Sequence, residues 1–152
     1  MEKADEDFQI IRLTKTYLNE ARQLLEDCDL TPAGVGKGNG DFLLLVNAGS
    51  KKLQAIIGWE IFADSALSRS LAVREQYRQC GRAKILVERA IEQLRTNGKT
   101  QLYLLTQTAE AYFKKFGFVV IERQNIPDGL LLQSELKGIC PQSSVCMYRQ
   151  IK

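Results

Sequence analysis

The amino-acid sequence predicts an α/β (α+β) domain, built on a mixed sheet with helices on both faces. Seven short segments, each apolar or alternating, are typical of strands. Segments with helical spacing of apolar residues alternate with them along the chain. The 152 residues, 45% hydrophobic and 26% charged, suit one core, so we expect a single domain over residues 1–152.

The first half of the chain is expected to form a strand, a helix and a hairpin. FQIIRL (8–13) predicts a strand, and Thr14 can cap the helix that follows. The apolar face of this helix consists of Leu18, Ala21, Leu25 and Cys28. After the turn-rich loop TPAGVGKGNG, the β-rich runs 42–48 and 53–63 are separated by GSKK, which suits a hairpin.

The second half is expected to alternate strands and helices. A strand over 67–73 leads into a helix that ends at Asn97-Gly98, and QLYLLT (101–106) is typical of a strand inside a sheet. The helix buries Ala83, Leu86, Ala90 and Leu94. The remaining predicted elements are a helix from Thr108 to Gly117, a strand over 118–124, a helix from Pro127 to about Leu136, and a strand over 143–151.

Composition argues against several classes of function. No apolar run approaches the roughly 20 residues that span a bilayer, and the polar, acidic first ten residues are unlike a secretion signal, so we expect a cytoplasmic protein. The net charge of +3 is spread along the chain, so nucleic acid is not an expected partner. The chain has no histidine and no C-x-x-C pair among its four cysteines, so no metal is expected.

The segment YRQCGRAK joins the fourth predicted strand to the long helix. A helix that begins just past Gly81 presents unpaired backbone N–H groups, which suit an anion, and Gly81 itself lets the backbone approach closely. Arg78, Arg82 and Lys84 add charge that can pair with phosphate, while Ala83 keeps the first turn narrow. The alternative is an ordinary turn with solvated basic residues, because one-glycine turns are common.

Two segments resemble the GNAT N-acetyltransferase family. SLAVREQYRQCGRAKILVERAIEQL resembles its coenzyme-A-binding segment, Arg/Gln-x-x-Gly-x-Gly/Ala, with Arg78, Gly81 and Ala83 in the defined positions. LYLLTQTAEAYFKKFGF resembles the family's next strand and helix, which end in Gly-Phe. RSLAV and CPQSSVCM are similar to blocks of the acetyltransferases found with arsenic-resistance systems, and N-acetylglutamate-synthase-type enzymes share part of the pattern. The resemblance implies a GNAT-like, mostly antiparallel seven-stranded sheet.

The resemblance further implies an enzyme that transfers acetyl from acetyl-CoA to the amine of a small molecule, such as an amino acid or an analogue, within a ternary complex. The loop amides would hold the pyrophosphate, the preceding strand edge would pair with the pantetheine arm, and a backbone N–H near Val73 would stabilise the oxyanion. The expected cofactor-binding residues are Leu71, Ala72, Val73, Arg78, Gln79, Cys80, Gly81, Arg82, Ala83, Lys84, Thr106 and Phe113. We expect a monomer or a homodimer.

The acid and the base of such a reaction depart from the common pattern. Many family members carry a tyrosine where this chain has Phe113, and Tyr112 points about 100° away on a helix, so we expect no tyrosine acid. Glu60, a carboxylate in an apolar strand, is the candidate general base, acting directly or through water, unless it faces solvent. Arg69 and Arg123 are candidates to bind a substrate carboxylate, unless they are surface residues or partners of nearby glutamates.

Two other classes of function fit parts of the sequence. A non-catalytic sensor or partner module would bind coenzyme A but lack a working base, and Phe113 is compatible with that. A phosphate- or RNA-binding module would use the basic loop for another anion and would show steep salt dependence.

Overall fold

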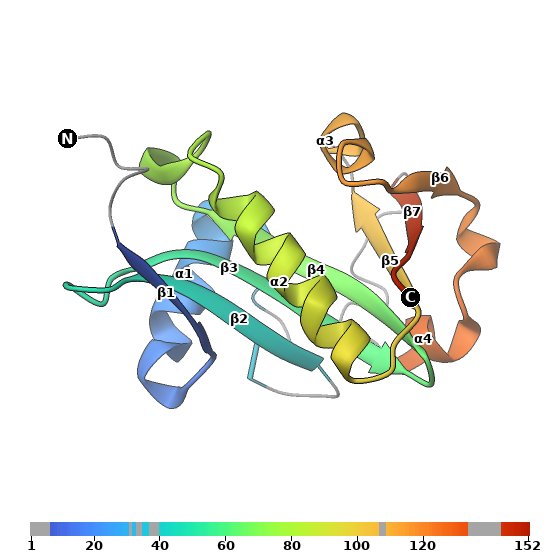
Figure 1. Cartoon of the computed structure of the whole chain (residues 1–152), viewed down its shortest axis with the longest axis horizontal. Helices are drawn as coiled ribbons and strands as arrows, with labels where there is room; N and C mark the ends of the chain where they lie inside the picture. The colour runs from blue at the N-terminus through green and yellow to red at the C-terminus, as the bar shows by residue number, and fades with distance from the viewer. Residues whose placement is uncertain (1–6, 31, 33–34, 37–39, 107–108, 134–143) are drawn as a thin grey trace.

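A computed structural model describes residues 7–30, 32, 35–36, 40–106, 109–133 and 144–152 (Figure 1). In chain order the elements are β1 (Phe8–Arg12), the 3-10 turn η2 (Lys15–Tyr17), α1 (Leu18–Asp27), β2 (Gly40–Asn47), β3 (Leu53–Phe62), β4 (Ser65–Val73), η3 (Glu75–Tyr77), α2 (Arg82–Thr96), β5 (Gln101–Thr106), α3 (Glu110–Lys114), β6 (Val119–Ile121), η4 (Arg123–Asn125), α4 (Asp128–Gln133) and β7 (Val145–Gln150).

The seven strands form one sheet in the order β1-β2-β3-β4-β5-β7-β6. Every neighbouring pair is antiparallel except β4 and β5, which run parallel. A parallel pair needs a crossover connection, and α2 provides it between these two strands. The expected mixed, mostly antiparallel seven-stranded sheet is therefore confirmed.

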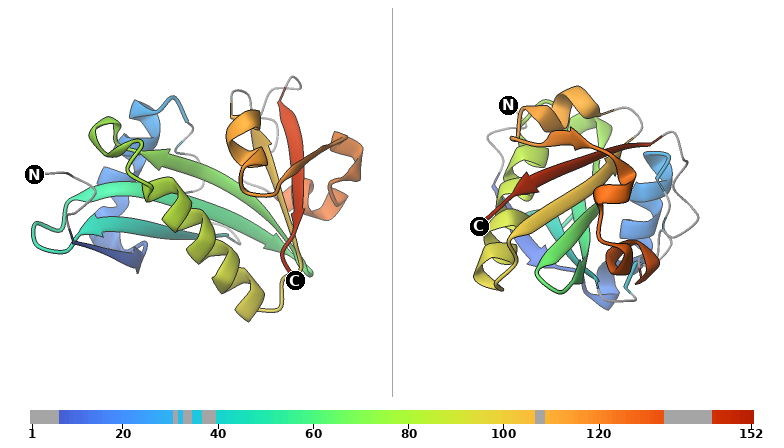
Figure 2. Two further views of the ribbon diagram at one scale, coloured as in Figure 1. Left: turned by 45° about the horizontal axis from the view of Figure 1, so that its top comes forward. Right: turned by 90° about the vertical axis from the view of Figure 1, so that its right-hand side faces the viewer.

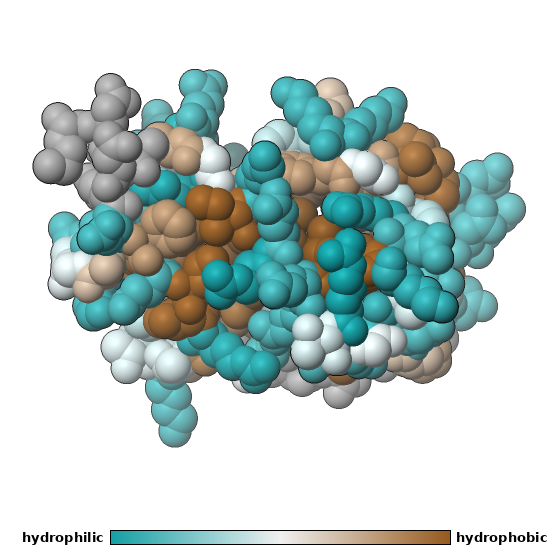
Figure 3. Space-filling model, in the orientation of Figure 1, coloured by the Kyte–Doolittle hydropathy of each residue, from teal (hydrophilic) through white to brown (hydrophobic). Residues whose placement is uncertain are grey.

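Helices α1 and α2 lie on opposite faces of the sheet (Figures 1 and 2). Along β2, Leu43 and Leu45 pack in the core cluster that contains α2, whereas Leu44 and Val46 pack in the cluster that contains α1. This alternation follows from the two-residue period of a strand, and both sides of β2 are buried as a result. Seen from the α2 side, hydrophilic residues cover most of the molecule, with hydrophobic residues visible on either side of the helix (Figure 3).

The sheet opens between β4 and β5. These two strands pair from Ser65 and Gln101 to Ser68 and Leu104, and in the described part of the chain the pairing stops there. β4 continues to Val73 alongside β3, while β5 stays paired with β7, so the two halves of the sheet diverge (Figure 2). We call this divergence the fork, with Ser68 and Leu104 at its floor.

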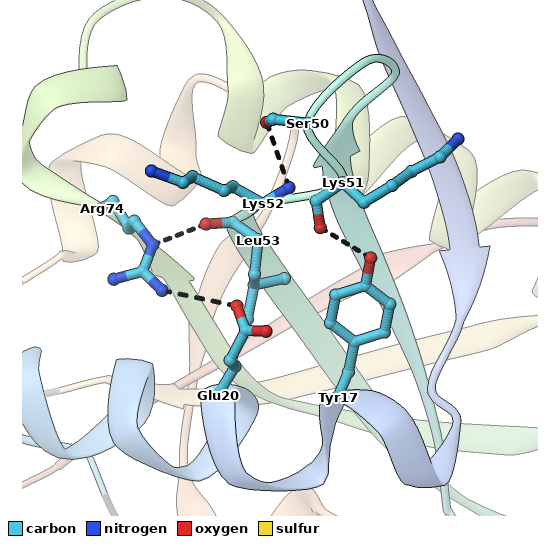
Figure 4. A network of polar contacts seen from close by, with 7 residues as sticks. All are labelled: Tyr17, Glu20, Ser50, Lys51, Lys52, Leu53 and Arg74. Atoms are coloured by element: carbon cyan, nitrogen blue, oxygen red, sulfur yellow. Dashed lines mark hydrogen bonds and ion pairs between the residues drawn. The ribbon is translucent and has the colours of Figure 1, made fainter.

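Helix α1 is held to the strand ends by polar contacts (Figure 4). The Tyr17 hydroxyl donates to the Lys51 carbonyl oxygen at 2.7 Å. The Arg74 guanidinium donates to the Leu53 carbonyl oxygen and lies 4.0 Å from the Glu20 carboxylate. The Arg74–Glu20 pair is partly solvent-exposed and adds little stability. Its main effect is to place the N-terminal end of α1 beside the end of β4.

Several element boundaries differ from those predicted. The helix expected after Thr14 begins with a 3-10 turn, and its α-helical part starts at Leu18. The strand predicted over 118–124 ends at Ile121, because residues Arg123–Asn125 form a 3-10 turn. The predicted ends at Thr108 and Leu136 lie outside the described residues. None of the described helices is long and apolar enough to cross a membrane.

Candidate active site

The loop before α2 has the geometry that its sequence predicts. Gly81 adopts a left-handed conformation, with φ of 80° and ψ of 8°, and Arg82 is the first residue of the helix. The first intrahelical hydrogen bond runs from the Ile85 N–H to the Gly81 carbonyl at 3.1 Å, so the N–H groups of Ala83 and Lys84 have no partner within the helix and are available to a ligand. A Cβ on Gly81 would meet no atom within 4 Å, so the space in front of these amides is open.

These amides face a cavity of about 920 Å³. Its wall combines the free side of β4, the loop and first turn of α2, the end of β5, and α3. The predicted residues that line it are Leu71, Ala72, Val73, Arg78, Gln79, Gly81, Arg82, Ala83, Lys84, Thr106, Phe113 and, from the substrate candidates, Arg69. Cys80, Glu60 and Arg123 are not among the lining residues.

The cavity wall is strongly basic. The lining residues include five with a positive charge and none with a carboxylate, within the part of the chain that the structure describes. The five are Arg69, Arg78, Arg82, Lys84 and Lys115. A concave site lined by one sign of charge focuses the electrostatic field, so this cavity is suited to a polyanion.

The three basic residues of the loop play different parts. Lys84 is exposed and lies 3.9 Å from Glu88, so its amine can turn towards the cavity at little cost. Arg78 is also exposed, and its Nε donates to the Val73 carbonyl oxygen at 3.0 Å. Arg82 is buried, and its Nε donates to Gln54 Oε1 at 3.0 Å. This burial corrects the expectation that all three side chains face an anion, because the Arg82 guanidinium is held between Gln54 and the Phe8 ring.

Glu60 and Arg69 form a buried ion pair between β3 and β4. Arg69 Nη1 lies 3.6 Å from Glu60 Oε1, and both side chains are nearly inaccessible, at 1% and 3% exposure. The alternative that Glu60 faces solvent is therefore wrong. Arg69 also donates from Nε to Ser70 Oγ at 2.9 Å and stacks 5.5 Å from the centre of the Phe42 ring. Glu60 thus lies behind Arg69, which is the member of the pair that reaches the cavity.

Arg123 is placed differently from Arg69. It lies in η4, half-buried, and the structure does not bring it into the cavity wall beside Arg69. Its role in binding a substrate carboxylate stays a prediction.

An aromatic cluster from α3 closes one side of the cavity. Tyr112 and Phe113 both line it, and their ring centres lie 5.5 Å apart. Phe113 also packs 5.8 Å from Phe118, while Tyr112 packs 5.1 Å from Phe116. Burial raises the pKa of the Tyr112 hydroxyl, which keeps it protonated at neutral pH. Tyr112 and Phe113 point about 100° apart on the helix, but both line the cavity because α3 lies along the edge of the cavity.

Other lining residues were not anticipated. Cys28, at the C-cap of α1, lies 3.5 Å from Arg78 Nη2, although 50 positions separate them in sequence. Leu30, Ser68, Leu104 and Phe116 also border the cavity. The four-residue spacing of Tyr112 and Phe116 is a helical signal that could have identified α3 as a wall. No local signal connects Cys28 to this site.

Comparison with known proteins identifies the family. A sequence profile of the acetyltransferase (GNAT) domain matches residues 38–120, which is more than half of the chain. The chain belongs to the GNAT acetyltransferase family. An uncharacterized N-acetyltransferase of Chlorobaculum tepidum is 32% identical over 78 residues, covering 51% of this chain and 48% of the relative, so the match spans about half of that relative's length.

Solved structures share the fold. A GNAT-family acetyltransferase from Staphylococcus aureus Mu50 superposes with a TM-score of 0.75 at 16% identity, covering 96% of this chain and 100% of that one. N-acetylglutamate synthase from Neisseria gonorrhoeae, complexed with coenzyme A and N-acetyl-glutamate, gives 0.78 at 17% identity, covering 97% of this chain and 36% of that one. At such identities the similarity establishes the fold alone. The comparisons give no support to the arsenic-resistance branch.

Proposed function

We propose that the protein transfers the acetyl group of acetyl-CoA to the amine of a small molecule in a ternary complex. The observation that carries the proposal is the basic cavity, which joins the open N-terminus of α2 to the free edge of β4. Coenzyme A has a matching shape and charge, because a diphosphate and a further phosphate stand at one end of a long neutral arm.

The diphosphate would bind at the start of α2. The backbone N–H groups of Ala83 and Lys84 have no intrahelical partner, and the positive end of the helix dipole favours an anion there. Lys84 and Arg78 can add charge-assisted hydrogen bonds from the exposed side of the loop. Arg78 would have to release the Val73 carbonyl oxygen to do so.

The pantetheine arm would then run along β4 towards the fork. Leu71, Ala72 and Val73 line the cavity on the side where β4 has lost its pairing with β5, so their backbone can hydrogen-bond an added strand. A backbone N–H near Val73 would face the oxyanion formed when the amine attacks the thioester carbon. The departing thiolate, with a pKa of about 8.5, can take its proton from water, so Phe113 in the wall is no obstacle.

The cavity favours an acceptor whose amine has a low enough pKa to be partly neutral at pH 7 without a general base. An α-amino group, with a pKa of about 7.7–8.0, is neutral in roughly a tenth to a sixth of molecules at pH 7, whereas a lysine-like amine is neutral in about one of 2,500. The described cavity wall contains no carboxylate, and Glu60 lies behind Arg69. The geometry thus supports Glu60 as a positioning residue for Arg69 better than as a base in direct contact with the amine.

An amino acid or a close analogue is the acceptor class that we propose. Arg69 lines the cavity on β4, and its guanidinium, 1% exposed, would have to turn out of its pair with Glu60 to bind an acceptor carboxylate through its planar donors. The fold neighbour from Neisseria gonorrhoeae was solved with an acetylated amino acid, which is consistent with this class.

The test begins with calorimetric titration of acetyl-CoA, followed by a panel of amino acids, peptides and simple amines assayed by release of the free coenzyme-A thiol. We expect saturable acetyl-CoA binding and turnover with some free amino acids. Tight binding without turnover on any amine would instead favour the coenzyme-A sensor. Absence of binding by folded protein would contradict both, and binding that depends steeply on salt without preference for the pantetheine arm would favour a phosphate or RNA ligand.

A further inference from the structure

Gln54 is a fully buried polar residue of β3 that the proposed reaction does not use. The pairing of β3 with β2 passes from Ala55–Leu45 to Leu53–Val46, so Gln54 is an extra residue in β3 and forms a β-bulge. Bulges re-aim side chains and are frequent beside active sites. This bulge lies at the end of β3 that meets the loop between β4 and α2.

Both ends of that loop are bound to Gln54. At its start, the Arg74 N–H donates to the Gln54 carbonyl oxygen at 2.9 Å. At its end, Arg82 Nε donates to Gln54 Oε1 at 3.0 Å. Arg78 and Gly81 lie between these two points and line the cavity. One residue of β3 therefore sets the distance between the two ends of the loop.

The Arg82 side chain is also held by two aromatic rings. Its guanidinium carbon lies 5.0 Å from the centre of the Phe8 ring in β1 and 5.9 Å from the centre of the Tyr77 ring in the loop. Arg82 is only 2% exposed and Gln54 is 0% exposed, so water hardly competes for the hydrogen bond between them. In such surroundings both the cation–π contacts and the hydrogen bond are stronger than at the surface.

The Gln54 amide leaves one of its own polar groups unsatisfied. Its Nε2 is buried and has no hydrogen-bond partner among the residues that the structure describes. A buried donor without a partner costs stability, and an apolar side chain of similar size would avoid that cost. Packing alone therefore gives no reason for a glutamine at this position, whereas the bond to Arg82 does.

We infer that Gln54 is a positioning residue for the coenzyme-A site and that it acts through Arg82. The inference rests on the proposed function and extends it to the residue that prepares the loop for the ligand. By holding Arg82, Gln54 keeps the N–H groups of Ala83 and Lys84 in place before a diphosphate arrives. The ligand then binds without the entropic cost of ordering the loop.

The experiment measures by calorimetry the affinity for acetyl-CoA and for its nucleotide half, adenosine 3′-phosphate 5′-diphosphate, so that no acceptor needs to be known. A hydrogen bond to a charged group changes an equilibrium constant by roughly ten- to a hundredfold. Gln54→Leu removes Oε1 but keeps the backbone carbonyl, and it should weaken the binding of both ligands about tenfold. Gln54→Glu keeps an acceptor for Arg82, so it should bind both ligands within about threefold of wild type.

Arg82→Met tests the other side of the bond. It removes the donor and keeps an unbranched side chain, so it should weaken binding about as much as Gln54→Leu does. The variant with both substitutions should bind no more weakly than either single variant, because the two changes remove the same hydrogen bond.

Arg95→Met is the matched control on the same helix. Arg95 also donates from Nε across the fold, to the Ile151 carbonyl oxygen, but it lies in the last turn of α2, far from the loop. Its replacement should lower the free energy of unfolding in urea and leave the affinity for both ligands unchanged.

Three results would overturn the inference. The first is unchanged affinity in Gln54→Leu, with circular dichroism showing that it folds. The second is an equal loss of affinity in Gln54→Leu and Gln54→Glu, and the third is a double variant in which the two effects simply add. If Gln54→Leu does not fold, Arg82→Met decides, since unchanged affinity in that variant also contradicts the inference. If wild-type protein binds neither ligand, the proposed function fails, which is a distinct result.

Discussion

The buried pair of Glu60 and Arg69 allows a sharp test of what Glu60 does. Both side chains are at most 3% exposed, so solvent hardly screens either charge. Removing one partner leaves the other charge buried, which costs about 3–5 kcal/mol. For a domain of this size, each kcal/mol lowers Tm by about 2–4 °C, so Glu60→Leu or Arg69→Met should lower it by about 6–20 °C.

The two charges should be strongly coupled. Replacing both by apolar side chains removes the unpaired charge, so the double variant should recover most of the stability that each single variant loses. Urea unfolding followed by fluorescence is a direct assay, because Trp59 is the only tryptophan of the chain and is buried next to Glu60.

A second, exposed ion pair serves as a control that separates the effect of burial from the effect of the distance between the charges. Lys114 and Glu110 lie closer together, at 2.9 Å, but their side chains are 56% and 42% exposed. Glu110→Gln should therefore cost no more than about 0.5 kcal/mol. The reasoning would be refuted if the Glu60 and Arg69 single variants each cost less than about 1 kcal/mol and their effects simply added.

The same variants bear on catalysis. If Glu60 positions Arg69, Glu60→Gln should raise KM for the acceptor and keep the acidic limb of the pH–rate profile. If Glu60 is the general base, that limb should disappear while the KM for the acceptor changes little.

Three further predictions concern single residues. Gly81→Ala should cost about 1–2 kcal/mol of stability, because an L-residue must hold φ near 80°. The added Cβ should also weaken acetyl-CoA binding at least tenfold, because it would occupy space that the ligand approaches. Unchanged affinity in calorimetry would contradict this close approach of the ligand. Tyr112→Phe should retain turnover, because no tyrosine acid is required; loss of turnover with intact acetyl-CoA binding would show that Tyr112 is the acid. Burial, then the charges of Tyr148 and Asp64, raise the pKa of Tyr103. Since the folded pKa exceeds the unfolded value of about 10, stability should be fully present below pH 10 and fall as pH rises above it, and Tyr103→Phe should flatten this alkaline loss in thermal melts.

The sequence by itself determined the order of the elements, the family and the start of α2. These features are local: a glycine followed by helical spacing specifies where a helix begins, and alternating or apolar runs specify strands within a few residues. The basic loop could therefore be predicted as an anion site before any fold was known, and all but one of its predicted residues line the cavity.

Only the tertiary structure decided which charged side chains face that cavity. Arg82 and Glu60 look like the other polar residues of their segments, but strand pairing and helix packing bury both. Arg69 and Arg82 both line the cavity with side chains that are almost fully buried, and Cys28 reaches the same wall from the end of α1, 45 positions before Val73. Which side chains are buried depends on strand register and on the packing of distant segments, and the periodicity within one segment does not predict it.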